Sequence, residues 1–201
     1  MLGLSSLYSF GHIQQNVTSA QYFQKFGYVI GGITTHTFMR SVQKLCEQEN
    51  YTHVAFVARD GFSLQKIFNV IVRGSVETSY VYAPRIMSAV NRLDFDNFKS
   101  YSYGGKDLIR ILNYYAKDLN MPVKQYSISE ALEALKLASP TLVPLIKRNL
   151  HVYRQYLQER IPDEHSLVVD TMAAGFSAQN LIQVSLDREQ KFAYWGTHAT
   201  F

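Results

Sequence analysis

Three short apolar segments of this sequence each end in a turn that carries polar or glycine residues. The segments are residues 53–58, 79–83 and 167–170, and the turns that follow them are residues 59–61, 84–85 and 171–175. Short, nearly continuous apolar runs predict strands that are covered on both faces, as in a parallel α/β sheet. Ligands bind to an open sheet of this kind beyond the carboxyl ends of its strands. We therefore expect the three turns to lie side by side and to form a site.

Segments with helical periodicity alternate with these strands. The expected helices run from a cap at Thr34 or Thr35 to about Glu49, over residues 62–72 and over residues 176–187, and a last strand covers residues 192–195. The alternation predicts an open, mainly parallel Rossmann-like α/β sheet over residues 27–201. An irregular or helical lead-in is expected at residues 1–26.

Residues of about 93–160 interrupt the alternation of strands and helices. Three helices are expected there: residues 107–119, a helix that starts near Ser127, and a helix that Ser139 caps with Pro140 at its first position. Ser127 and Glu130 have the spacing of a capping box, and proline is favoured in the first turn of a helix. We expect a helical insertion between two strands, placed to cover the cleft at the strand ends.

The composition limits the kind of protein. At 201 residues, with 47% hydrophobic and 18% charged residues, the chain has the size and composition of one globular domain with an insertion. Its net charge of +4 is spread along the chain, which permits an anionic ligand but argues against nucleic acid as a partner. No segment approaches the ~18 apolar residues of a membrane span, and the start of the chain lacks the pattern of a signal peptide, so we expect a cytoplasmic location.

Disulfide and metal chemistry find little support in the sequence. Cys46 is the only cysteine, which excludes an intrachain disulfide and a multi-cysteine metal site, and its apolar helical neighbours predict a packed thiol. The six histidines show no metal-ligand spacing. The chain ends a few residues after the last expected strand, so we expect it to be truncated at the C-terminus. A neighbouring domain or a homo-oligomer therefore stays open as a partner.

The first turn contains Arg59, Asp60 and Gly61. The two charged residues leave a buried strand where side chains face the crevice, and glycine lets the backbone come close to a ligand. The helix that follows presents free N–H groups and the positive end of its dipole, which favour phosphate or carboxylate. The alternative is that Arg59 and Asp60 pair with each other or with neighbours and hold the strand ends together.

The second turn holds Arg85 after Pro84, and an arginine there could clamp an anion through two hydrogen bonds. It could equally pair with Asp60 or with Asp170 across the strand ends. Asp170 closes the third strand and is a candidate acid, base or metal ligand, or a structural cap.

The third turn lacks the residues of a P-loop. Its small residues and the following helix start nevertheless make a plausible cradle for phosphate or sugar. The candidate ligand-binding residues there are Gly175, Ser177 and Gln179.

Three blocks of the sequence resemble a bacterial domain that follows a haloacid-dehalogenase-like region in proteins of surface polysaccharide biosynthesis. Residues 57–67 resemble its "LARDG, then LxKI" block, residues 80–85 its next strand, and residues 168–179 its "VDxGxxGxxQ" block. Ala83, Pro84 and residues 171–174 depart from the pattern of that domain.

The resemblance implies a Rossmann-like domain associated with glycan assembly. The positions that match its site are Arg59, Asp60, Arg85, Asp170 and Gln179. It does not imply a dehalogenase-type phosphatase, because no D-x-D motif followed by Thr or Val ends a strand of this chain.

Two functions of different classes follow. The first is binding of a phosphorylated sugar or nucleotide-sugar, as part of a transferase or hydrolase, in which Arg59 and Arg85 hold the anion. Asp60 or Asp170 then acts as a base or binds Mg²⁺. The second is a non-catalytic scaffold or interaction domain, whose polar groups at the strand ends tie the sheet to the insertion.

A lesser alternative is a phosphoribosyltransferase-like protein. Residues 167–177 look like a strand that ends in an acidic residue, followed by a small-residue loop that would hold a ribose 5-phosphate. That family usually has two adjacent acidic residues at this place, and Thr171 occupies the second one.

Overall fold

A computed structural model describes residues 18, 20, 21, 24, 27, 31–96, 98–100, 105–173 and 176–197. The expected lead-in at residues 1–26 lies almost wholly outside the described residues. So does Gly175, one of the candidate ligand-binding residues.

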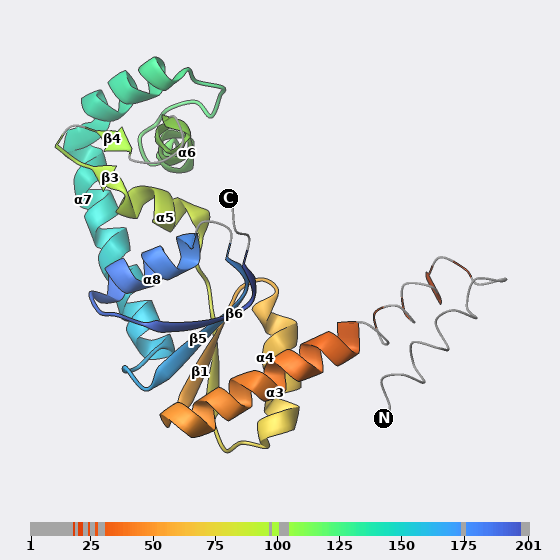
Figure 1. Ribbon diagram of the computed structural model, residues 1–201. Helices are drawn as coiled ribbons and strands as arrows, with labels where there is room; N and C mark the ends of the chain where they lie inside the picture. Colours follow the sequence, from red (N-terminus) through yellow and green to blue (C-terminus); the bar gives the residue numbers. More distant parts are fainter. Residues whose placement is uncertain are drawn as a thin grey trace.

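Four parallel strands form the main sheet, in the spatial order β2-β1-β5-β6 (Figure 1). Their bounds are His53–Val57 for β1, Glu77–Val81 for β2, Ser166–Ala173 for β5 and Lys191–Thr197 for β6. All five residues of β1 are buried, as expected for a strand that has a neighbour on each side and helices on each face. The open, parallel, Rossmann-like α/β fold predicted from the sequence is thus confirmed.

The chain leaves the central pair of strands in opposite directions. From β1 it passes through α4 (Gly61–Val72) to β2 on one side, and from β5 it passes through α8 (Ser177–Leu186) to β6 on the other side. The boundary between β1 and β5 is therefore a topological switch point, where open α/β sheets bind their ligands.

Helices cover both faces of the sheet (Figure 1). On one face, α3 (Gly32–Glu49) and α4 pack on β1 and β5 through a core that includes Met39, Phe56 and Phe68. On the other face, α8 and the long helix α7 (Ile128–Arg160) pack through a core that includes Leu157 and Ile182. These layers explain why β1 and the first part of β5 are apolar and buried.

The first helix of the sheet domain begins earlier than the sequence suggested. Gly31 is the N-cap residue of α3, and the hydroxyl of Thr34 donates to its carbonyl oxygen at 3.2 Å. Thr35 is buried inside the helix. The prediction that Thr34 or Thr35 caps the helix is therefore wrong, because the backbone is already helical at Gly31.

The insertion between β2 and β5 has a core of its own. Besides the first half of α7 it contains α5 (Arg85–Asn91), α6 (Lys106–Tyr115) and a two-stranded sheet of β3 (Leu93–Asp94) and β4 (Lys99–Ser100). The side chains in its centre are fully buried and include Ile111, Leu112, Leu135, Leu142 and Ile146. Helix α5 was not expected from the sequence, and α6 ends at Tyr115 instead of residue 119.

One helix, α7, stands where two were predicted. It starts at the expected capping box: the Glu130 amide donates to the Ser127 hydroxyl at 3.2 Å, and the Ser127 amide donates to the Glu130 carboxylate at 2.7 Å. The predicted new helix at Ser139 and Pro140 is wrong, because Pro140 lies inside α7.

Two prolines, Pro140 and Pro144, interrupt the hydrogen bonds of α7 without ending it. Proline inside a helix lacks the amide donor and clashes with the preceding turn, which usually bends the helix. Figure 1 shows that α7 changes direction along its length. Leu135 and Leu142, which flank Pro140, are both fully buried in the insertion core, so packing holds both halves of the helix in place.

Helix α7 also closes the outer edge of β2. The Tyr153 hydroxyl donates to the carbonyl oxygen of Tyr82 at 2.8 Å, and the Tyr156 hydroxyl accepts from the Tyr82 amide at 3.0 Å. The Tyr156 hydroxyl also lies 3.4 Å from the carbonyl oxygen of Tyr80, to which it donates. Burial raises the pKa of Tyr153, so its hydroxyl keeps the proton that this bond needs. Backbone groups at the end of an edge strand are thereby satisfied by side chains.

The burial of His53, at the start of β1, can be tested by the pH dependence of the stability. His53 is 7% exposed, and its Nδ1 atom has no hydrogen-bond partner in the described part of the chain. Burial lowers the pKa of His53 below its ordinary value of 6.5, against the smaller opposing effect of Glu77 and Asp163.

We predict that the free energy of unfolding falls as the pH drops below about 6.5, because the unfolded chain then binds a proton that the folded His53 resists. His53→Gln should show a smaller fall between about pH 7.5 and about pH 5, measured by urea unfolding. An equal fall in both proteins would show that His53 does not titrate differently in the two states.

Candidate functional site

A hydrogen bond across the switch point joins the first turn to strand β5. The hydroxyl of Thr171 donates to Oδ2 of Asp60 at 3.1 Å, although the two residues are 111 positions apart. The amide of Thr171 donates to Oδ1 of Asp170 at 2.8 Å. Two carboxylates are therefore linked through one threonine at the carboxyl end of β1 and β5.

The third turn starts later than expected. Residues 171–173 were predicted to be turn, but they continue β5, because Met172 and Ala173 pair with Gly196 and Thr197 of β6. Asp170 consequently lies within a strand, in register with Tyr194. It still lies at the end of the sheet where β1 stops.

Arg59 leaves the sheet directly after β1 and is exposed. Its backbone is fixed, since its carbonyl oxygen accepts from the Phe62 amide at 3.2 Å and from the Tyr80 hydroxyl at 3.3 Å. Within the described residues no ion pair joins Arg59 to Asp60 or to Asp170. Arg59 and Asp60 therefore do not pair with each other, but Asp60 bonds to a neighbour, Thr171, across the strand ends, which is the other form of the structural alternative.

Gly61 has a packing role that needs no ligand. A Cβ atom at this position would lie 2.9 Å from the carbonyl carbon of Phe56 and 3.0 Å from its Cβ atom. The start of α4 thus lies directly on the backbone of β1, which only glycine permits. This contact alone accounts for a glycine at position 61, without the predicted role in ligand approach.

Arg85 is the first residue of α5 and is exposed. Asn91, at the other end of α5, donates to the hydroxyl of Ser185 at 3.1 Å, near the end of α8. The last turns of the two helices are therefore in contact, and Figure 1 shows the helices side by side. In the part of the chain described, Arg85 forms no ion pair with Asp60 or Asp170, so the structural alternative for Arg85 is also not seen.

Two further candidates lie at the start of α8. Ser177 is its exposed first residue. Gln179 accepts a hydrogen bond from the Tyr194 hydroxyl at 2.8 Å. Burial, with a smaller contribution from the charge of Asp170, raises the pKa of Tyr194 to about 12, so Tyr194 stays a donor at neutral pH. Gln179 is thereby oriented by a fixed partner, with its carbonyl oxygen already engaged.

Sequence reasoning missed the exposed aromatic residues beside these polar groups. Tyr82 is 56% exposed, Phe62 51% and Phe176 44%. Each lies within a few residues of a candidate site residue, and this proximity was the signal available in the sequence.

The described residues contain no group of three or more His, Cys, Asp or Glu side chains that could hold a metal ion. Asp60 and Asp170 provide two carboxylates. Mg²⁺ is commonly held by one or two carboxylates together with substrate phosphates, so one of them with a bound phosphate would meet that requirement.

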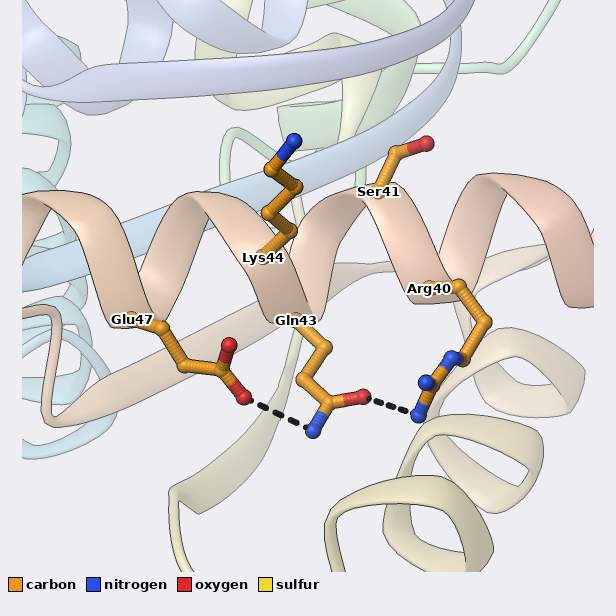
Figure 2. A pocket seen from close by; sticks show the side chains of 5 residues that line it. All are labelled: Arg40, Ser41, Gln43, Lys44 and Glu47. Atoms are coloured by element: carbon orange, nitrogen blue, oxygen red, sulfur yellow. Dashed lines mark hydrogen bonds between the residues drawn. The ribbon is translucent and has the colours of Figure 1, made fainter.

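A hollow of about 440 Å³ on α3 is a less suitable place for a ligand (Figure 2). Its five lining residues, Arg40, Ser41, Gln43, Lys44 and Glu47, all come from one helix. Arg40 donates to Gln43 at 2.7 Å and Gln43 donates to Glu47 at 2.9 Å, so these three side chains satisfy one another. No residue of the strand ends takes part.

Comparison of the sequence with profiles of known protein families and with curated proteins gave no match. The resemblance to a domain of polysaccharide biosynthesis proteins stays a prediction from the three sequence blocks. None of the helices in the described ranges combines the length and the apolar character needed to cross a lipid bilayer.

The packing of Gly61 on Phe56 leads to a prediction about stability. Gly61→Ala should destabilise the protein by roughly 1–3 kcal/mol, because the added methyl group overlaps backbone atoms that cannot easily move. Gly32→Ala is the matched control: the nearest atom to its new Cβ would be 3.8 Å away. Denaturant unfolding of both variants measures the difference, and equal midpoints would contradict the close contact.

Proposed function

We propose that the carboxyl end of this sheet binds a phosphorylated sugar or a nucleotide-sugar. The observation that carries the proposal is the hydrogen bond between Thr171 and Asp60, which joins the turn after β1 to β5 across the switch point. Arg59 and Arg85 follow β1 and β2, and both are exposed and form no ion pair with the two carboxylates in the described part of the chain. Two exposed cations whose charge these carboxylates do not neutralise favour an anionic ligand.

The helices add to this preference. Both α4 and α8 start at the same end of the sheet, and neither N-cap residue makes a side-chain capping hydrogen bond. Amides in the first turn of such helices, apart from the Phe62 amide that already donates to Arg59, are donors for phosphate oxygens, and the helix dipole favours a negative charge there. A phosphate would thus meet arginine side chains and backbone amides together.

The carboxylates suit the remainder of such a ligand. Asp60 and Asp170 can accept hydrogen bonds from sugar hydroxyl groups, remove a proton from one of them, or hold a Mg²⁺ ion that the phosphate also contacts. Gln179, in the first turn of α8, offers an amide group. The setting in surface polysaccharide biosynthesis is part of this proposal and rests on the sequence resemblance alone.

The competing hypothesis is a scaffold whose strand-end polar groups tie the sheet to the insertion. The bonds that join α7 to β2 and to Tyr82 come instead from Tyr153, Tyr156 and the carbonyl of Arg160, which accepts from the Ser79 hydroxyl. Arg59 and Arg85 take no part in them. Because other groups join the sheet to the insertion, the two arginines are not needed for that role, which favours a binding role for them.

Replacing Arg59 by an uncharged residue of similar length tests the proposal. Arg59→Gln should weaken binding of glucose 1-phosphate or UDP-glucose by roughly 10- to 100-fold, the loss expected for a hydrogen bond to a charged group. Its melting temperature should stay unchanged because the side chain is exposed. Arg148→Gln, on the exposed face of α7, is the matched control and should bind like the wild type.

Isothermal calorimetry with and without Mg²⁺ provides the measurement, and phosphoribosyl pyrophosphate is titrated alongside to test the phosphoribosyltransferase alternative. Loss of folding in Arg59→Gln and Asp170→Asn would support the scaffold. Unchanged affinity in Arg59→Gln would refute the proposed anion site.

A further inference from the structure

A row of three aromatic rings lies beside the first turn. Phe62, Tyr80 and Tyr82 follow one another edge to face, with ring centroids 5.9 Å apart for the first pair and 5.2 Å apart for the second. We call these three residues the aromatic shelf. The Tyr80 hydroxyl donates to the carbonyl oxygen of Arg59 at 3.3 Å, so the shelf is joined directly to the residue proposed to hold phosphate.

Tyr82 is the member of the shelf best placed for a ligand. More than half of its surface is exposed, yet its backbone is held on both sides by α7, through the hydroxyls of Tyr153 and Tyr156. Exposed aromatic rings on an anchored backbone lose little freedom when a ligand stacks on them. Phe62 differs, because the Lys66 ammonium already covers its ring at 4.2 Å from the centroid.

We infer that the ligand of the proposed site is a nucleotide-sugar whose base stacks on Tyr82 while its phosphates contact Arg59. This inference rests on the proposed function and names the substrate class within it. Flat aromatic bases gain from stacking on tyrosine about 1–3 kcal/mol in comparable single-strand sites. A simple sugar phosphate has no aromatic ring to place there, so the shelf contributes only to the nucleotide-sugar.

A second group of rings lies across the switch point near α8 and consists of Phe176, Phe192 and Tyr194. Its exposed member is Phe176, and the Tyr194 hydroxyl is engaged by Gln179. No hydrogen bond of this group fixes the backbone of Phe176 from outside its own helix in the described residues. Tyr82 is therefore the preferred place for the base, and Phe176 is the position to test against it.

The test compares UDP-glucose, ADP-glucose and glucose 1-phosphate in calorimetry. Wild-type protein should bind the two nucleotide-sugars more tightly than glucose 1-phosphate. Tyr82→Leu should weaken both nucleotide-sugars by roughly 5- to 150-fold and leave glucose 1-phosphate unchanged, whereas Tyr82→Phe should retain the affinity.

Tyr114→Leu is the matched control. Tyr114 has the same 56% exposure as Tyr82 and a comparable edge-to-face contact, with Tyr115 at 4.9 Å, but it lies on α6 in the insertion. Saturation-transfer NMR on the wild-type protein adds a readout that needs no variant, since base protons should receive magnetisation more strongly than the protons of glucose.

The outcomes separate the two proposals. If glucose 1-phosphate binds but the nucleotide-sugars bind no tighter, or if Phe176→Leu and not Tyr82→Leu removes the difference, the inference is overturned and the anion site stands. If none of the three compounds binds, the proposed function and the inference fail together.

Discussion

The pairing of β1 with β5 is the contact on which the rest of the structure depends. It brings together two segments separated by the whole insertion, in a parallel register that runs from His53 opposite Ser166 to Phe56 opposite Val169. The paired residues of both strands are buried, so the pairing is stabilised by the helices on either face as well as by backbone hydrogen bonds. Asp60 and Thr171 meet only because this register places the ends of the two strands side by side.

The insertion and the sheet support each other through α7. The first half of that helix completes the core of the insertion, and its second half covers the sheet and supplies the tyrosine hydroxyls that bind the end of β2. The change of direction of α7, which contains Pro140 and Pro144, lets one helix serve both cores. The position of Tyr82 is thus a consequence of the insertion, although Tyr82 itself follows a strand of the sheet.

Much of this fold follows from local pattern. The strand β1 was predicted to within one residue because every one of its residues is apolar or buried, and the capping box of α7 was predicted because Ser127 and Glu130 determine it locally. The extension of β5 through Ala173 was not predictable in the same way, since it depends on pairing with β6. The continuity of α7 through Pro140 likewise depends on tertiary packing, which overrides the local preference of proline.

The two margins of the sheet are unequal. At β2, tyrosine hydroxyls of α7 occupy main-chain amide and carbonyl groups that another strand would need. At β6, in the ranges that the structure describes, no strand pairs on the outer side. A strand added beside β2 would have to displace these hydroxyls, so the flank of the crevice that carries Tyr82 has a closed border.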